Sequence, residues 1–535
     1  MRRGRIYFII LVLFSFMCLA VNLLVVGESR IVNKYDAGGN IRDCMRFSRL
    51  PLWTPDGMYS FLRLRGASHP RLYHAAAGPV FALCGRVGLR DVNKAVVLIN
   101  YIFFLTLFFS VYGIGGFLYD RQTGLLAAIM LSLSPVIFGH ARICMLDLPM
   151  AAAVSVSFLF LFYARNFSSL AFSLLAGIAF GVSQLIKEAA LIFIIGSLVY
   201  YAAVSIASAR GKDRVKRGRN ICALLATFIV IAGPVYFNPL NPDILAKYLD
   251  KTFSIQHNAG DILYYLRCFP GMYFGILFFL ALCPAIMMLA FDIGKINRFL
   301  IIWLVVPLAA FSLSPNKTAR FLIPILPAAF LLLSSVISGK RFSKLRKPYT
   351  AVVLTAGIMQ YLALSFLPGS EIPQFFKERG LYAWINGDLL ESGIVSVYRD
   401  GNYVIVNELT GIFTGEPAPG ARPKRAVVTF DYGIQDAVNC GLAARGVELF
   451  IECPQQADPS DAPRPGTVDW GIFLLSADYV IDKTGDPGRR GALEDIGGAL
   501  KNAFDLNRRL YLEVGSVKLD NGDVISVYKR IRSDI

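Results

Sequence analysis

The sequence predicts a polytopic α-helical membrane protein that ends in a soluble α/β domain. Of its 535 residues 55% are hydrophobic and only 17% are charged, with a mean hydropathy of +0.53. This is too apolar for a soluble protein. Eleven apolar runs lie within residues 1–368, and residues 369–535 have the mixed composition of a soluble domain. We therefore divide the chain into a membrane domain, 1–368, and a second domain, 369–535.

Each apolar run is long enough for one membrane helix, although several are near the lower limit of about 17 residues. The first run, 6–27, follows the basic segment MRRGR and has no small-residue cleavage site, so we interpret it as a retained anchor. The others are at 95–118, 123–139, 148–164, 170–186, 189–209, 221–237, 270–291, 299–314, 321–338 and 349–367. The sequence thus predicts about eleven transmembrane helices.

The distribution of basic residues orients these helices. With a cytoplasmic N-terminus, the basic segments RRGR, 210–219, 294–298 and 339–347 all become cytoplasmic, as the positive-inside rule requires. An odd number of helices then places residues 369–535 outside the cytoplasm. We expect a multi-pass protein of the inner or plasma membrane. The net charge of +17 comes from these short loops, so we exclude nucleic acid as a partner.

The first outer loop, 28–94, carries the first candidate site residues. Asp36 precedes Gly38 and Gly39, which suggests a carboxylate on backbone that can bend around a ligand. Arg63, His69 and Arg71 follow, and they are residues suited to binding a phosphate.

A second group of ionisable residues interrupts apolar sequence on the same predicted side. It comprises Asp147, Lys187, Glu188, Lys317 and Arg320. Ionisable groups at the edge of a span are costly in lipid and are often functional. Carboxylates and cations gathered at one membrane face suggest acid/base chemistry on a lipid phosphate.

The second domain combines strand and helix patterns. Segments RAVVTF, VELFIE, DYVID and RLYLEV predict strands, DAVNCGLAAR and ALEDIGGALKNAF predict helices, and the end predicts a hairpin that turns at Asn521-Gly522. Without a glycine-rich phosphate loop, it is best interpreted as a substrate-guiding or stabilising cap. Cys440 and Cys453 lie together in this polar region, and a disulfide between them is one alternative.

Four motifs, in their order and spacing, resemble the GT-C membrane glycosyltransferases, in the protein O-mannosyltransferase and lipid A aminoarabinose transferase branch. They are Asp36 after the first run, SHPRLY in the same loop, RICMLDLP at the end of the third run and NKTARFLIPILPA at the tenth. The resemblance covers residues 1 to about 368.

The resemblance implies inverting transfer of a sugar from a polyprenyl-phosphate carrier to a lipid, glycan or protein acceptor on the outer side. Asp36 resembles the general base and Asp147 the acidic residue of the second outer loop. Lys317 and Arg320 resemble contacts to the donor phosphate, to which we add Arg63, His69, Arg71 and Lys187. The enzyme would neutralise the departing phosphate while a base takes the acceptor's proton.

Several structural alternatives stay open at this point. Asp36 is also suited to a turn or cap, His69 to a backbone hydrogen bond, Asp147 to capping a helix, and Lys317 and Arg320 to interfacial anchoring. We expect no required cofactor or metal; a divalent cation shared by Asp36 and Asp147 is the alternative. For the whole chain the alternative is a flippase of lipid-linked sugars, which needs polar groups at mid-membrane depth.

Overall fold

The computed structural model describes residues 2–28, 35–50, 52–62, 69–89, 91–237, 260–291, 297–339, 342–366, 424–428, 449–452, 479–483, 503–518 and 524–531. Contacts divide the chain into two compact units. The first comprises 1–29, 47–80 and 93–398, and the second comprises 30–46, 81–92 and 399–535. The predicted domain boundary at residue 368 stays a prediction.

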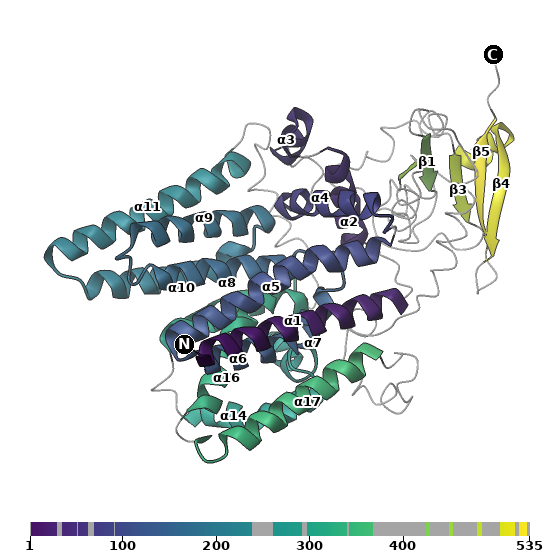
Figure 1. The fold of residues 1–535 in the computed structure, drawn as a ribbon. Helices are drawn as coiled ribbons and strands as arrows, with labels where there is room; N and C mark the ends of the chain where they lie inside the picture. Colours follow the sequence, from purple (N-terminus) through teal and green to yellow (C-terminus); the bar gives the residue numbers. More distant parts are fainter. Residues whose placement is uncertain are drawn as a thin grey trace. The chain divides into compact units, whose positions relative to one another are not determined.

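The first unit is helical (Figure 1). Its helices, including α4, which continues into the second unit, are α1 (Arg2–Glu28), α3 (Pro55–Leu62), α4 (Leu72–Arg86), α5 (Val92–Leu118), α6 (Arg121–Ser132), α7 (Pro135–His140), α8 (Asp147–Tyr163), α9 (Leu170–Ile186), α10 (Ala190–Ala207), α11 (Gly211–Tyr236), α13 (Tyr264–Cys268), the π-helix η1 (Phe269–Tyr273), α14 (Ile276–Phe291), α15 (Arg298–Leu313), the 3-10 helix η3 (Ala319–Ile325), α16 (Leu326–Ser338) and α17 (Arg346–Phe366).

Six of the described helices, counting η3 with α16 as one, are long and apolar enough to cross a membrane, and a bent pair could make a seventh. Three more, α8, α9 and α15, are apolar but shorter. All eleven predicted runs overlap helices, which confirms a multi-pass helical membrane fold. The count of eleven spans stays a prediction.

The third predicted run, 123–139, is interrupted in the structure. It forms α6 and α7, separated at Leu133 and Ser134, because Pro135 has no N–H and starts a new helix at its first position. α6 itself begins where the side chain of Asp120 accepts a hydrogen bond from the N–H of Thr123 at 2.9 Å. The expectation of one continuous helix here was wrong.

A sharper break, with a bend of 114°, separates the helical segment formed by α13 and η1 from α14. Gly275 lies between them with φ +75°, a conformation that favours glycine, and a Cβ there would collide with Gln360. The Gln360 amide donates to the carbonyl of Phe274 at 2.7 Å and accepts from the N–H of Phe278 at 3.1 Å. One side chain of α17 therefore satisfies backbone groups that the break leaves open, as a broken membrane helix requires.

Two kinds of contact hold neighbouring helices together. Along α1 and α5, Phe8 contacts Phe109 and Phe16 contacts Tyr101, so the two helices run antiparallel. α5 and α6 approach so closely that a Cβ on Gly115 would lie 2.4 Å from the Cα of Gly124. Such close approach through small residues is typical of membrane helices.

The predicted first outer loop is largely helical in the described part. Its last two helices, α3 and α4, contribute Phe61 and Ala75 to a core cluster with Leu185 of α9 and Val235 of α11. α9 and α11 also lie side by side (Figure 1). This cluster attaches the loop's helices to the α9 end that carries Lys187.

The second unit contains most of α2 (Tyr35–Arg49), whose last three residues belong to the first unit, and a sheet. α2 corrects one expectation, since Asp36, Gly38 and Gly39 lie inside a helix rather than on freely bending backbone. Ala37, Ile41 and Cys44 are buried, and this apolar stripe offsets the cost of a glycine in a helix, about 1 kcal/mol each relative to alanine.

The sheet has five strands in the order β2-β1-β3-β5-β4. The strands are β1 (Lys424–Val428), β2 (Leu449–Glu452), β3 (Tyr479–Lys483), β4 (Tyr511–Lys518) and β5 (Val524–Arg530). β1 pairs in parallel with β2 and β3, whereas β5 pairs antiparallel with β3 and β4. The predicted strands and the final hairpin are thus confirmed, and its turn lies outside the described residues, as do Cys440 and Cys453. That residues 369–535 form a soluble domain outside the cytoplasm stays a prediction.

Candidate active site

A buried ion pair joins the start of α8 to the end of α9. Lys187, the residue that ends α9, donates from Nζ to Oδ1 of Asp147 at 2.7 Å, and the two side chains are 8% and 1% exposed. The cap of α8 is Leu146, so Asp147 does not fill the capping role that its sequence position also allowed. Because a buried charge is stable only when it is compensated, the pair fixes both residues at one end of α8.

A phenylalanine brings a second cation to this pair. Lys187 Nζ lies 5.3 Å from the ring centroid of Phe321, and the guanidinium carbon of Arg320 lies 5.7 Å from the same centroid. Both distances are within cation–π range. Two cations and one carboxylate give this cluster a formal charge of plus one. Lys187 is buried and Arg320 is only half-buried, so Arg320 is the more accessible cation.

His140 lies at the end of α7, and its ring is fully buried. The ring interacts electrostatically with Asp147, Arg320 and Lys187. Its Nδ1 donates to the carbonyl of Val136 at 2.8 Å. Within the described part of the chain, Nε2 has no hydrogen-bond partner. Since Nδ1 carries the proton, Nε2 of the neutral ring is a buried acceptor at the edge of the charged cluster.

The next residue of the α9–α10 connection forms a second pair. The two carboxylate oxygens of Glu188 lie 2.9 and 3.0 Å from Nδ1 of His69. Burial raises the pKa of Glu188, but His69 and Lys187 more than offset this and hold it below its ordinary value. Both side chains are about one-fifth exposed. His69, a predicted phosphate ligand, is thus paired with Glu188, the residue that directly follows Lys187.

Hydrogen bonds hold the turn between α7 and α8. The Asn100 amide donates to the carbonyls of Ile143 at 2.7 Å and His140 at 3.1 Å, and its oxygen accepts from the Tyr73 hydroxyl at 2.9 Å. The four groups are buried or nearly so. A buried, satisfied network of this kind gives the turn one geometry, which positions Asp147 at the start of α8.

Arg142, in the same turn, has a structural role. Its Nε donates to Oδ1 of Asn22 at 2.8 Å, and one Nη donates to the hydroxyl of Ser365 at 2.7 Å. Its side chain is 2% exposed and lies over the ring of Phe138. It ties the turn to α1 and α17.

Two other predicted phosphate ligands contact backbone. Arg71 is buried and donates from Nη1 to the carbonyl of Ser60 at 2.8 Å. Lys317 is also buried and donates from Nζ to the carbonyl of Ser314 at 2.6 Å. These contacts stabilise the local chain, and the phosphate-binding roles of both residues stay predictions.

The two remaining predicted site residues are Asp36 and Arg63. Asp36 lies in the first turn of α2, but its side chain is outside the described residues, and so is all of Arg63. Their roles stay predictions. Among the described residues, no group of three or more His, Cys, Asp or Glu side chains is arranged to hold a metal ion, and metal dependence also stays open.

Sequence reasoning missed His140 and Phe321. His140 directly follows an apolar run and precedes Asp147 by seven residues, a signal similar to that used for the charged residues. Phe321 gave no signal, because an aromatic residue in FLIPILPA has the pattern of an ordinary core residue.

Part of the sequence matches a known protein family. Residues 76–237, which include Asp147 and Lys187, match the dolichyl-phosphate-mannose-protein mannosyltransferase family. No curated protein matches the chain in sequence.

Solved structures match over nearly the whole chain. ArnT from Cupriavidus metallidurans bound to undecaprenyl phosphate has a TM-score of 0.63 at 14% identity, over 96% of this chain and 97% of that chain. Arabinofuranosyltransferase AftD from Mycobacteria has a TM-score of 0.52 at 14% identity, over 98% and 40%. AglB, the oligosaccharyltransferase of Archaeoglobus fulgidus, in complex with an inhibitory peptide and a dolichol-phosphate, has 0.51 at 12% identity, over 98% and 75%.

The likeness to these structures establishes the fold, and the family match covers the segment that carries the buried ion pair. Together they support the resemblance to GT-C membrane glycosyltransferases predicted from the sequence, and the chain shares the fold of these solved enzymes.

Proposed function

We propose that the chain transfers a sugar from a polyprenyl-phosphate-linked donor to an acceptor hydroxyl on the extracytoplasmic side of the membrane, with inversion at the anomeric carbon. The observation that carries the proposal is the cluster of Lys187, Arg320 and Asp147 at one end of α8. Its excess positive charge suits a lipid phosphate. The ArnT and AglB structures, which contain polyprenyl-type phosphates, support the same donor class.

In the proposed reaction the acceptor oxygen attacks the anomeric carbon as the bond from that carbon to the phosphate oxygen breaks. The bonding electrons leave with the phosphate, which departs as polyprenyl phosphate, and Asp36 accepts the hydroxyl proton. A single displacement of this kind inverts the anomeric carbon.

We propose different tasks for the two cations of the cluster. Arg320 is the more accessible one, and we place it in contact with the donor phosphate, where a charge-assisted hydrogen bond opposes the charge that develops on the leaving group. Lys187 is buried against Asp147, so it does not contact the donor and instead contributes positive electrostatic potential at the position of the phosphate. Asp147 is then a positioning residue, because it holds Lys187 and contributes to the placement of both cations around Phe321.

Membranes containing the protein should be incubated with a panel of radiolabelled polyprenyl-phosphate sugars. We expect label from at least one donor to become covalently attached to an acceptor. Asp36→Asn should lower the turnover by a factor of about 10² to 10⁴, because it removes a base and keeps the size of the side chain. Asp43→Asn, in the same helix, is the matched control and should retain turnover.

Two results would refute the proposal. Label that crosses to the other leaflet without forming a new glycosidic bond would identify a flippase. An Asp36→Asn protein that folds and turns over at the parent rate would remove Asp36 as the base and move the search to Asp147.

A further inference from the structure

A pocket of about 790 Å³ lies at the end of the helical unit opposite the candidate active site. It is lined by residues near the start of α1 (Arg5, Phe8), the end of α5 (Tyr112, Phe117), the start of α6 (Arg121) and the end of α8 (Tyr163). Asp147 and Tyr163 are the two ends of one helix, so about 24 Å separates this pocket from the ion pair, at about 1.5 Å per residue. The pocket is therefore a separate site.

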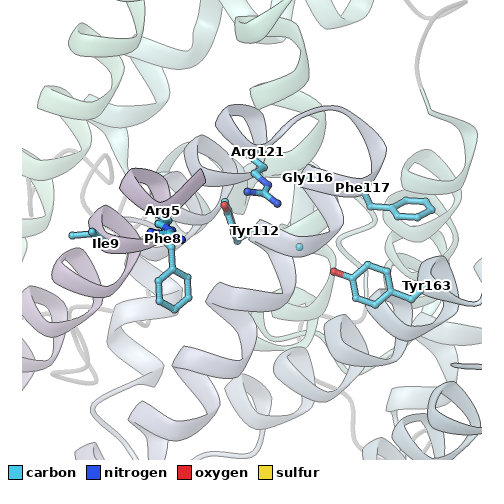
Figure 2. A pocket seen from close by; sticks show the side chains of 9 residues that line it. Arg5, Phe8, Ile9, Tyr112, Gly116, Phe117, Arg121 and Tyr163 are labelled. Atoms are coloured by element: carbon cyan, nitrogen blue, oxygen red, sulfur yellow. The ribbon is translucent and has the colours of Figure 1, made fainter. Parts of the chain in front are cut away.

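The pocket combines positive charge with apolar and aromatic surface. Figure 2 shows the side chains of Arg5 and Arg121 on either side of Tyr112. Neither guanidinium makes an ion pair or hydrogen bond with any residue that the structure describes, and the residues lining the pocket include no carboxylate. The nearby Asp120 is engaged in capping α6 through Thr123. The lining thus has two cations and no compensating anion.

The apolar part of the lining continues onto the outside of the helices. Phe8, Phe117 and Tyr163 are 51%, 41% and 37% exposed. In a membrane helix bundle such surfaces contact acyl chains, and aromatic residues at helix ends lie at headgroup level. The pocket also falls within the range of about 300 to 1,000 Å³ typical of small-molecule sites.

We propose that this pocket binds an anionic phospholipid of the leaflet next to the N-terminus. Its phosphate lies between Arg5 and Arg121, and its acyl chains lie along Phe8 and Phe117. The two arginines supply the charge complementarity, and the exposed aromatic side chains distinguish a lipid from a soluble anion. The proposal does not depend on the sugar-transfer reaction, because the pocket shares no residue with the candidate active site.

The test uses the full chain in nanodiscs that contain phosphatidylcholine with a minor fraction of phosphatidylglycerol. Native mass spectrometry counts the lipids retained by the released protein. We expect the parent to retain phosphatidylglycerol in preference to phosphatidylcholine. Each arginine should contribute about fivefold, or about 1 kcal/mol, so Arg5→Ala with Arg121→Ala should lower the preference by about 25-fold.

Two further variants keep the test decisive if the double variant does not fold. Gly116→Leu fills the pocket and keeps both charges. A Cβ on Gly116 meets Arg121 Cγ at 3.8 Å, an ordinary contact, and the bound lipid should be lost. Arg214→Ala removes an exposed arginine of α11, and this variant should retain the bound lipid.

Four results would overturn the proposal. The first three are equal retention of the two lipids by the parent, full retention by Gly116→Leu, and a loss in Arg214→Ala as large as in the double variant. The third result would mean that diffuse surface charge attracts the lipid. Displacement of phosphatidylglycerol by an equal concentration of inorganic phosphate would also reject a lipid site in favour of a simple anion site.

Discussion

The two ends of α8 handle positive charge in opposite ways. At the Asp147 end, Lys187 is buried and paired with a carboxylate, and a network of hydrogen bonds holds the adjoining turn. At the Tyr163 end, Arg5 and Arg121 are exposed, and no described carboxylate pairs with either. The same helix thus connects a pre-arranged polar site to an open cationic pocket.

The difference shows where the chain has accepted a cost in stability to fix a geometry. Burying Lys187 and Asp147 incurs a desolvation penalty that the pair only offsets when both partners are present. Exposed arginines incur little such penalty and contribute little to folding. Geometry that costs stability is expected at a reacting centre, whereas surface cations suit a lipid headgroup.

The largest expected effect is on stability at the Asp147 end. Lys187→Met leaves Asp147 buried without its partner and should destabilise the fold by about 3 to 5 kcal/mol. Arg121→Met, at the other end of α8, should change stability by less than about 0.5 kcal/mol. Thermal unfolding in detergent, followed by intrinsic fluorescence, measures both, with exposed Lys212→Met as the matched lysine control. Equal shifts in Lys187→Met and Lys212→Met would abolish the contrast between the two ends.

A double variant sharpens the same comparison. Asp147→Leu combined with Lys187→Met removes both charges, and replacing a whole buried pair by apolar residues is close to neutral for stability. We expect the double variant to recover most of the decrease in unfolding temperature caused by Lys187→Met, while sugar transfer stays lost. A double variant as unstable as Lys187→Met alone would mean that the lysine stabilises the fold through contacts other than Asp147.

The smallest effect is expected at the partly exposed pair of His69 and Glu188. The folded-state pKa of Glu188 lies below its ordinary value of 4.5. The pair therefore contributes stability that is fully present above pH 4.5 and is lost as the pH falls through the lower folded-state pKa. Glu188→Gln should remove about 1 kcal/mol or less and reduce this acid sensitivity. If the stability of the Glu188→Gln protein depends on pH in the same way as that of the parent between pH 3 and 7, the pair is not formed in solution.

Much of the fold could be predicted because membrane helices are encoded locally. Every apolar run overlaps a helix, since hydropathy over about 20 residues reports insertion directly. The breaks were harder to predict. Pro135 divides a run whose hydropathy looks continuous, and the break at Gly275 depends on Gln360, which is 85 residues away in the sequence. Asp36 was assigned to an open loop because its two glycines obscured the amphipathic pattern of α2.

The site could be predicted in composition but not in pairing. Charged residues at the edges of apolar runs identified Asp147, Lys187 and Arg320, because ionisable groups are rare in membrane helices. The partners depend on tertiary structure, since Lys187 meets Asp147 across 40 residues and Phe321 joins two cations from different elements. No local pattern encodes such contacts.

The most direct test of the central claim is the donor dependence of Arg320→Ala. If the more accessible cation of the Asp147 end contacts the donor phosphate, loss of one charged hydrogen bond costs about 1.5 to 3 kcal/mol. The apparent affinity for the polyprenyl-phosphate sugar should then fall by about one to two powers of ten. Arg214→Ala, an exposed arginine in α11, should leave it unchanged. A folded Arg320→Ala protein that saturates with donor at the parent concentration would contradict the account.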